Sequence, residues 1–193
     1  RIKKDLKSDN FVLFAEPKFD GLAISITYIH GNFFSAVTRG DGVIGEDVTA
    51  NVKTIRSLPL QLDGKNIPSK LCLKAEIYMS LPEFKKLNRN LSKNNLKIFA
   101  NPRNVAAGSI RQLDPKIASN RNLKIFFHGL IEDDTFIEET HSQSLDRISK
   151  YGLPICNLNK IVESIDNAQR YIEHLNEIRT KLSYEIDGIV FKI

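Results

Sequence analysis

Cysteine, methionine and tryptophan are scarce in this sequence. Its 193 residues include two cysteines, one methionine and no tryptophan. Cys72 and Cys156 stand far apart and form no CxxC pair, which excludes a cysteine-rich zinc module within the chain. Two isolated cysteines suit a reducing compartment, so we expect a cytoplasmic protein whose thiols are buried as small apolar groups.

Long apolar runs are missing as well. No stretch approaches the roughly 20 residues that a membrane-spanning helix needs, and residues 1–10 are too polar for a signal peptide. We therefore expect no membrane association. The length suits one domain with a core of its own, and 41% apolar and 26% charged residues are typical of globular proteins.

The charge balance is mildly basic. The net charge is +5 and the isoelectric point is near 9.1. Nucleic-acid-binding domains show such an excess, but so do many unrelated proteins. The charge therefore favours a polyanionic partner without requiring one.

Hydropathy predicts more strands than helices in the first half of the chain. Strands are predicted at 11–16, 22–30, 33–38, 71–79, 123–130 and 186–193, with a turn at Gly31-Asn32 between the second and third. Helices are predicted at 80–91, 104–113, 141–151 and 164–182. Ser80 and Glu83 suggest a capping box at the first helix, and Gly152 and Pro154 end the third. Without a βαβ rhythm, the pattern indicates an α+β fold with antiparallel sheets flanked by helices.

The segment 40–45, GDGVIG, matches the GxGxxG pattern literally. The dinucleotide-binding fingerprint needs a buried strand before it and a helix after it. Here the preceding strand is the return arm of a predicted hairpin. We instead expect a turn whose glycines adopt positive φ and which fixes Arg39 and Asp41 beside a site.

The segment 16–21, EPKFDG, places Lys18 between two predicted strands. By itself a KxDG sequence is better explained as a turn with solvated charges. A lysine amine attacks phosphorus only when it is unprotonated, so a nucleophilic Lys18 would need desolvation or neighbouring cations. Asp20 could then orient the amine or a metal-bound water.

Two further segments carry basic side chains. In DGIVFK, near the end of the chain, strand alternation puts Val190 and Lys192 on one face. A lysine on an apolar strand needs a partner, either phosphate or an unseen carboxylate. Arg103 and Arg111 lie eight positions apart, about two helical turns, and are either phosphate ligands or solvated charges.

Five segments, in this order, resemble the adenylation domain of bacterial NAD-dependent DNA ligases. They are EPKFDGLAISITY (16–28), TRGDGVIGEDVTANVKTI (38–55), KAEIYM (74–79), FANPRNVAAGSIRQLDP (99–115) and YEIDGIVFKI (184–193). The resemblance covers nearly the whole chain. It implies the nucleotidyltransferase fold of DNA ligases and mRNA capping enzymes, which is ATP-grasp-like.

The resemblance also implies a reaction. Lys18 would attack the α-phosphate of NAD to form lysyl-AMP, AMP would pass to the 5′-phosphate of a nick, and the 3′-hydroxyl would seal the strand with release of AMP. The implied cofactors are NAD and Mg²⁺, or Mn²⁺ in its place. The implied partner is nicked double-stranded DNA, and the protein is expected to be a monomer.

Residues 1–193 would form one nucleotidyltransferase core taken from a longer protein. The resemblance implies that the N-terminal module for nicotinamide mononucleotide, the last nucleotidyltransferase motif, and the OB, zinc-finger, helix-hairpin-helix and BRCT domains lie outside it. Zinc is expected only in that C-terminal part. We therefore expect the chain alone to be not fully competent with NAD.

The resemblance assigns roles to individual residues. Lys18, Asp20 and Lys192 would be catalytic. Nucleotide contacts are implied for Glu16, Lys18, Arg39, Glu76, His128, Val190 and Lys192, with Glu16 and His128 at adenine. Metal contact, directly or through water, is implied for Glu76 and Asp187. Contacts with phosphates and DNA are implied for Arg103, Arg111 and Arg179.

The sequence departs from the family pattern at two places. Lys74-Ala75-Glu76 replaces the common Arg-Gly-Glu, and a lysine lacks the planar fork of arginine. His128 stands where the family often has tyrosine. Three alternatives remain open: an ATP-dependent ligase or capping-type enzyme, a non-catalytic nucleic-acid-binding module, and a Rossmann oxidoreductase.

Overall fold

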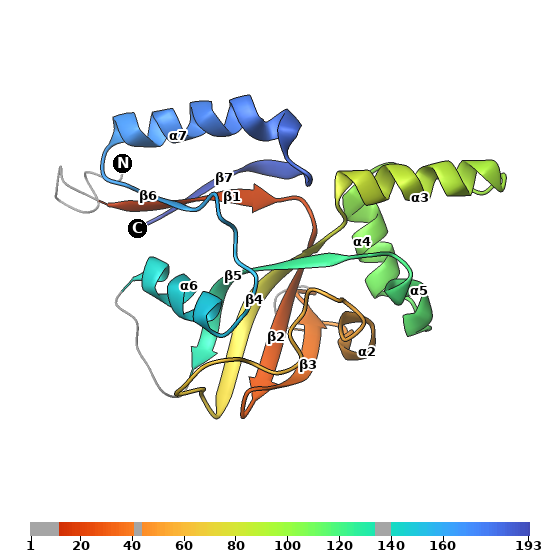
Figure 1. Cartoon of the computed structure of the whole chain (residues 1–193), viewed down its shortest axis with the longest axis horizontal. Coiled ribbons are helices and arrows are strands. Elements are labelled where there is room, and N and C mark those ends of the chain that lie inside the picture. Colours follow the sequence, from red (N-terminus) through yellow and green to blue (C-terminus); the bar gives the residue numbers. More distant parts are fainter. Residues whose placement is uncertain (1–11, 41–43, 134–139) are drawn as a thin grey trace.

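The computed structural model describes residues 12–40, 44–133 and 140–193, and its strands form two antiparallel sheets (Figure 1). The smaller sheet has the order β6 (Lys160–Val162), β1 (Leu13–Phe19) and β7 (Ile186–Lys192). The larger sheet has the order β3 (Asn32–Thr38), β2 (Leu22–Ile29), β4 (Lys70–Tyr78) and β5 (Lys124–Asp133). The predicted α+β class with antiparallel sheets is confirmed.

The helices surround these sheets. They are α2 (Thr49–Val52), α3 (Leu81–Lys93), α4 (Pro102–Ile110), α5 (Pro115–Ser119), α6 (His141–Lys150), α7 (Ile165–Ile178) and the 3₁₀ helix η1 (Arg179–Lys181). Helix α7 covers the smaller sheet, α6 packs on β5, and α3 projects away from both sheets (Figure 1). No helix among the described residues has both the length and the apolar composition needed to cross a bilayer.

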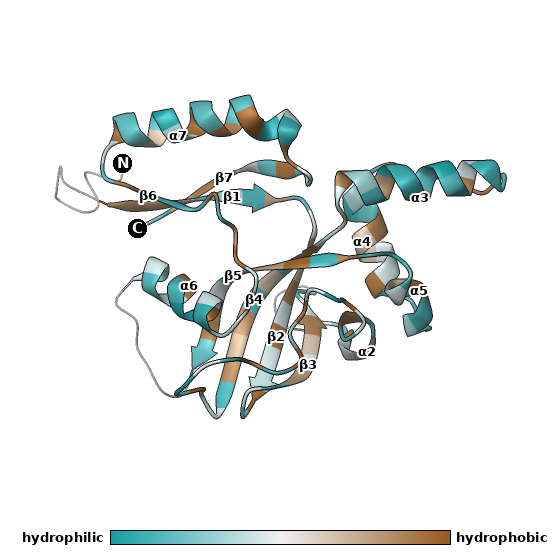
Figure 2. Ribbon diagram, viewed as in Figure 1, coloured by the Kyte–Doolittle hydropathy of each residue, from teal (hydrophilic) through white to brown (hydrophobic). Residues whose placement is uncertain are grey.

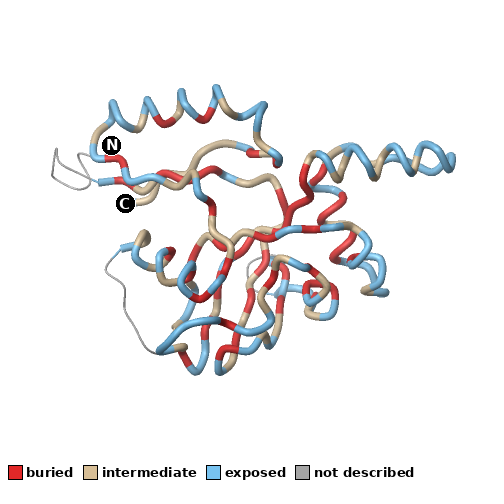
Figure 3. Tube along the Cα trace, in the orientation of Figure 1, coloured by how far each residue is buried: buried red, intermediate tan, exposed pale blue. Residues whose placement is uncertain are grey.

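Each sheet has its own core because strand side chains alternate between two faces. In β2, Ile24, Ile26 and Tyr28 are buried in the larger core. In the smaller core, β1 and β6 pack against Tyr171 and Leu175 of α7. Buried segments and apolar residues follow the central strands in both sheets (Figures 2 and 3).

The two sheets join at the end of β1, where the chain crosses into β2. An aromatic cluster fills this junction: the Phe19 ring centroid lies 4.8 Å from that of Phe126, which stacks 5.0 Å from Tyr78. Tyr184 packs against all three rings. A side chain at Gly21 would place a Cβ 2.3 Å from the carbonyl oxygen of Ile77, so only glycine fits this crossing.

Several local predictions need correction. The strand predicted at 11–16 is described from Leu13 and continues to Phe19, because β1 pairs with β7 up to that residue. Ser80 does stand at the N-cap of α3, but its side chain makes no cap hydrogen bond, so the capping box is wrong. The Glu83 carboxylate instead accepts a hydrogen bond from Asn122 Nδ2 at 2.9 Å.

Two turn and helix boundaries also differ. The hairpin turn uses His30 and Gly31, at φ 47° and 75°, and β3 already begins at Asn32. The helix predicted at 164–182 ends at Ile178 and continues only as η1. The third helix ends before Gly152, which has φ 80°, as predicted.

Candidate functional site

A cavity of about 290 Å³ opens where the two sheets meet. Its walls come from β1, β2, β4, β5 and β7, together with the end of β3 and the start of α4. The lining residues are Glu16, Pro17, Lys18, Phe19, Ala23, Arg39, Glu76, Arg103, His128, Asp187 and Val190. The structure therefore brings most of the residues predicted for a nucleotide site to one place.

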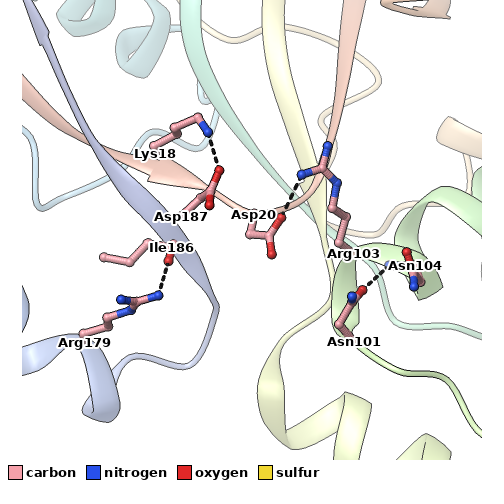
Figure 4. A network of polar contacts seen from close by, with 8 residues as sticks. All are labelled: Lys18, Asp20, Asn101, Arg103, Asn104, Arg179, Ile186 and Asp187. Atoms are coloured by element: carbon pink, nitrogen blue, oxygen red, sulfur yellow. Dashed lines mark hydrogen bonds and ion pairs between the residues drawn. The ribbon is translucent and has the colours of Figure 1, made fainter.

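Lys18 lies near the C-terminal end of β1 and lines this cavity. It lies opposite Gly188 of β7, and its Nζ forms an ion pair with the Asp187 carboxylate (Figure 4). The hydrogen bond from Lys18 is the main cause that lowers the pKa of Asp187. Both side chains stay about half exposed, so the amine can be reached from the cavity.

Asp20 points away from Lys18 and toward α4. Its Oδ1 accepts from Arg103 Nη1 at 3.1 Å (Figure 4). Asn101 caps α4 by accepting from the backbone N–H of Asn104 at 2.8 Å, which fixes the helix turn that carries Arg103. The carboxylate next to the Lys18 amine in space is thus Asp187, whereas Asp20 positions Arg103.

Glu76 lies on β4 and lines the cavity. Burial raises its pKa to about 7, against the opposing effect of the Arg103 guanidinium and a hydrogen bond from the Gly21 backbone. Both the protonated and the ionised form of its carboxyl group are therefore populated near neutral pH. A carboxyl in this state responds strongly to an added cation or phosphate.

Glu16 and Lys192 form a second charged group deeper in the smaller sheet. Lys192 Nζ lies 2.6 Å from Glu16 Oε1 and 2.9 Å from His141 Nε2, and His141 Nε2 lies 3.3 Å from Glu16 Oε2. Burial alone would raise the pKa of Glu16, but the hydrogen bonds from His141 and Lys192 outweigh it and lower the pKa. The carboxylate that the sequence left unidentified beside Lys192 is therefore Glu16.

Two histidines flank this group. His128 lines the cavity, and its burial lowers the pKa of the imidazole, which favours the neutral ring. Sequence reasoning missed His141, the first residue of α6, whose ring also packs edge-on against Phe14 at 5.0 Å. The available sequence signal was the capping box of Thr140 and Gln143, which marks the start of α6 and so the position of His141.

Four predicted residues are not among those that line the cavity: Asp20, Arg111, Arg179 and Lys192. Arg111 Nε pairs with Glu46 Oε2 at 2.8 Å and is not among the cavity residues. Arg179 donates to the Ile186 carbonyl at 3.0 Å and lines a neighbouring hollow of about 350 Å³ with Asp20 and Asp187. Arg179 thus borders the cavity, whereas Arg111 is held by Glu46 outside it.

The glycine-rich turn follows β3 and brings Arg39 to the cavity. Gly40 has φ 53°, and a Cβ there would stand 1.7 Å from the Ile44 carbonyl oxygen. The expected positive φ is confirmed for Gly40. Asp41 and the glycine at 42 lie outside the described residues.

Carboxylates surround the cavity without forming a closed metal cage. Among the described residues no group of three or more His, Cys, Asp or Glu side chains has the geometry of a metal site. Mg²⁺ is commonly bound by one or two carboxylates together with substrate phosphates. Glu76 and Asp187 are the two carboxylates predicted for metal contact, and both line the cavity.

The architecture defines the class of protein. The fold matches a solved structure, a putative ATP-dependent DNA ligase from Aquifex aeolicus, with a TM-score of 0.50 and 17% identity over 97% of this chain and 42% of that chain. This likeness shows a DNA ligase-type nucleotidyltransferase fold. The model of the NAD-dependent DNA ligase adenylation domain matches residues 1–193. The chain belongs to that family.

Relatives at higher identity agree with this assignment. A DNA ligase of Nitrosococcus oceani is 42% identical and one of Dehalococcoides mccartyi is 43% identical, each over the whole of this chain. The chain spans 29% and 28% of the lengths of these two proteins. It therefore corresponds to less than a third of each relative.

Proposed function

We propose that the chain forms lysyl-AMP on Lys18 as the first step of NAD-dependent DNA ligation. The observation that carries this proposal is the position of the Lys18 amine, in the wall of a cavity that also holds Glu76, Arg39 and Arg103. A solvated turn would not place a lysine in one cavity with the carboxylates of Glu16 and Glu76 and with two arginines. Membership of the adenylation-domain family supports the same reading.

In this step the Lys18 ammonium, ion-paired with Asp187, first loses a proton to water, and the neutral amine then forms a nitrogen–phosphorus bond to the α-phosphate of NAD. The bond from that phosphorus to the bridging oxygen breaks, nicotinamide mononucleotide leaves with the electron pair, and the amine loses a proton. Asp187 holds the amine in place before attack and is the nearest base for that proton. Lys192 lies on the same face of β7 as Val190 and is proposed to contact the transferred phosphate.

The remaining groups stabilise the negative charge that develops on phosphate oxygens. Arg39 and Arg103 supply cations at the cavity. A Mg²⁺ or Mn²⁺ ion at Glu76 and Asp187, bound directly or through water, would supply Lewis-acid stabilisation of the same charge. Glu16 and His128 are proposed to contact the adenine base.

Nick sealing belongs to the longer protein of which we propose residues 1–193 to be the nucleotidyltransferase core. There, AMP would pass to the 5′-phosphate of nicked double-stranded DNA, with Arg103, Arg111 and Arg179 contacting phosphates. Such an enzyme would act as a cytoplasmic monomer in DNA replication and repair, with any zinc bound in the C-terminal part. The chain alone is expected to use NAD incompletely.

The experiment that tests this function replaces the matching segment of the Nitrosococcus oceani relative with residues 1–193. The chimera should seal a nick with NAD and Mg²⁺ and should not do so with ATP. Sealing with ATP alone would favour the ATP-dependent alternative. Nick binding without any covalent AMP would favour a non-catalytic binding module.

A further inference from the structure

Helix α3 carries most of the net charge of the chain. Its 13 residues, 81–93, contain four cations and one carboxylate, a net charge of +3, whereas the whole chain carries +5. The other 180 residues together carry a net charge of only +2. The excess of positive charge is therefore concentrated on one helix.

The cations of α3 occupy a single face of the helix. Lys85, Arg89 and Lys93 follow one another at intervals of four residues, and Lys86 lies beside this stripe. Phe84 and Leu87 lie on the opposite side and pack against the main core. The stripe therefore faces solvent along the length of the helix.

These side chains are free of partners within the part of the chain that the structure describes. Lys85, Arg89 and Lys93 are exposed and form no ion pair there, and Lys86 has only a 4.0 Å approach to Glu83. The other long surface helices differ. Helix α6 mixes Asp146 with its cations, and α7 carries more carboxylates than arginines. A face of one sign is thus specific to α3, and solubility alone does not require it.

The position of α3 suits a linear polyanion. The helix begins just after β4, the strand that carries Glu76, and packs against α4, which carries Arg103. From there it projects away from both sheets and is exposed over its outer turns (Figures 1 and 3). Thirteen residues extend about 20 Å at 1.5 Å each, and cations four residues apart are about 6 Å apart along the axis. DNA phosphates repeat about every 3.4 Å of helix axis along each strand.

We propose that the basic stripe of α3, Lys85, Arg89 and Lys93, binds the phosphate backbone of duplex DNA beside the nick. The contact would be independent of base sequence, since lysine and arginine meet only phosphates there. This inference rests on the proposed function, which supplies DNA as the partner. It adds an interface about 20 Å long, on the order of six base pairs, outside the nucleotide cavity.

The test compares two triple variants of equal net charge. K85Q/R89Q/K93Q removes the stripe, and K65Q/K150Q/K160Q removes three exposed cations from other parts of the chain. Binding of the 193-residue chain to a blunt duplex of random sequence is measured by fluorescence anisotropy between about 50 and 200 mM salt. The slope of log K against log salt is negative for such binding. It should become less negative by roughly 3 in the stripe variant and by less than about 1 in the control.

Other outcomes would overturn the proposal. Equal slopes for the two variants would mean that only net charge matters. Absence of duplex binding by the parent chain would contradict the proposed interface. A stripe variant that loses binding to polyglutamate but keeps duplex binding would indicate an acidic protein as the partner. Circular dichroism checks that both variants remain folded.

A parallel measurement separates this inference from the proposed function. AMP attachment to Lys18 should be the same in the stripe variant and in its parent, because α3 is outside the cavity. If the parent forms no lysyl-AMP, the proposed nucleotide step fails, while the salt slopes still decide the role of α3.

Discussion

Lys192 Nζ lies 2.6 Å from Glu16 Oε1, although the two residues come from opposite ends of the described chain. The antiparallel register of β1 and β7 sets Glu16 opposite Val190, so that Lys192 is its diagonal neighbour on the same face. Glu16 is only 6% exposed, and an unpaired carboxylate there would be strongly unfavourable. The pair therefore joins β1 to β7 within the smaller sheet, at a carboxylate that also lines the cavity.

Replacing Lys192 with Met should destabilise the chain by about 1–3 kcal/mol, less than for a fully buried pair because Lys192 is partly exposed. Glu16→Gln combined with Lys192→Met should recover part of that loss, since no charge is then left alone. Urea unfolding of the two single variants and the double variant gives the coupling energy. A coupling near zero would contradict the pairing.

The pKa of Glu76, raised to about 7, makes stability depend on pH. The folded state holds this proton more tightly than the unfolded state, whose pKa is near 4.5. The free energy of unfolding should therefore fall as pH rises from about 4.5 to about 7, for the metal-free chain. Glu76→Gln should flatten this part of the profile, and an unchanged slope in the variant would assign it to another group.

Gly21→Ala should destabilise the chain by about 1–3 kcal/mol, because its Cβ would meet the Ile77 carbonyl at 2.3 Å and Glu76 Cγ at 2.9 Å. The matched control is Gly108→Ala in α4, where a Cβ would meet nothing within 4 Å. The control should stabilise by roughly 0.5–1 kcal/mol through helix propensity. Thermal unfolding of both variants shows whether the midpoint falls for Gly21→Ala and rises for Gly108→Ala.

Asp187→Asn should slow lysyl-AMP formation while leaving the stability of the chain nearly unchanged. The ion pair with Lys18 is half exposed, so its loss should change stability by less than about 1 kcal/mol. Lysyl-AMP formation should fall at least about tenfold, as expected for loss of a positioned base. Equal rates for variant and parent, followed by intact mass over time, would show that Asp187 has no role in the step.

Much of the fold was predictable from local sequence. Period-two alternation identified β2, and the glycine at 152 ended α6, because both signals act within a few residues. The short strand β6 and helices α2 and α5 were missed. Three to five residues carry too little periodicity, and β6 forms only because β1 pairs with it.

The site was predicted as a set of residues, whereas its pairings were not. Asp20 is adjacent to Lys18 in sequence, yet the crossing at Gly21 turns it toward Arg103, and Asp187 from β7 reaches the amine instead. His141 joins Glu16 only through the packing of α6 against the sheets. Such contacts depend on tertiary register, which a single sequence does not specify.

The most direct test of the nucleophile is the intact mass of the chain, and of its chimera with the Nitrosococcus oceani relative, after incubation with NAD and Mg²⁺. One AMP should be added to the parent form of the chimera, and peptide mapping should locate it on Lys18. Lys18→Ala should take up none, and neither should Lys18→Arg, because a guanidinium stays protonated and cannot attack. An AMP adduct that survives either substitution would contradict the assignment of Lys18.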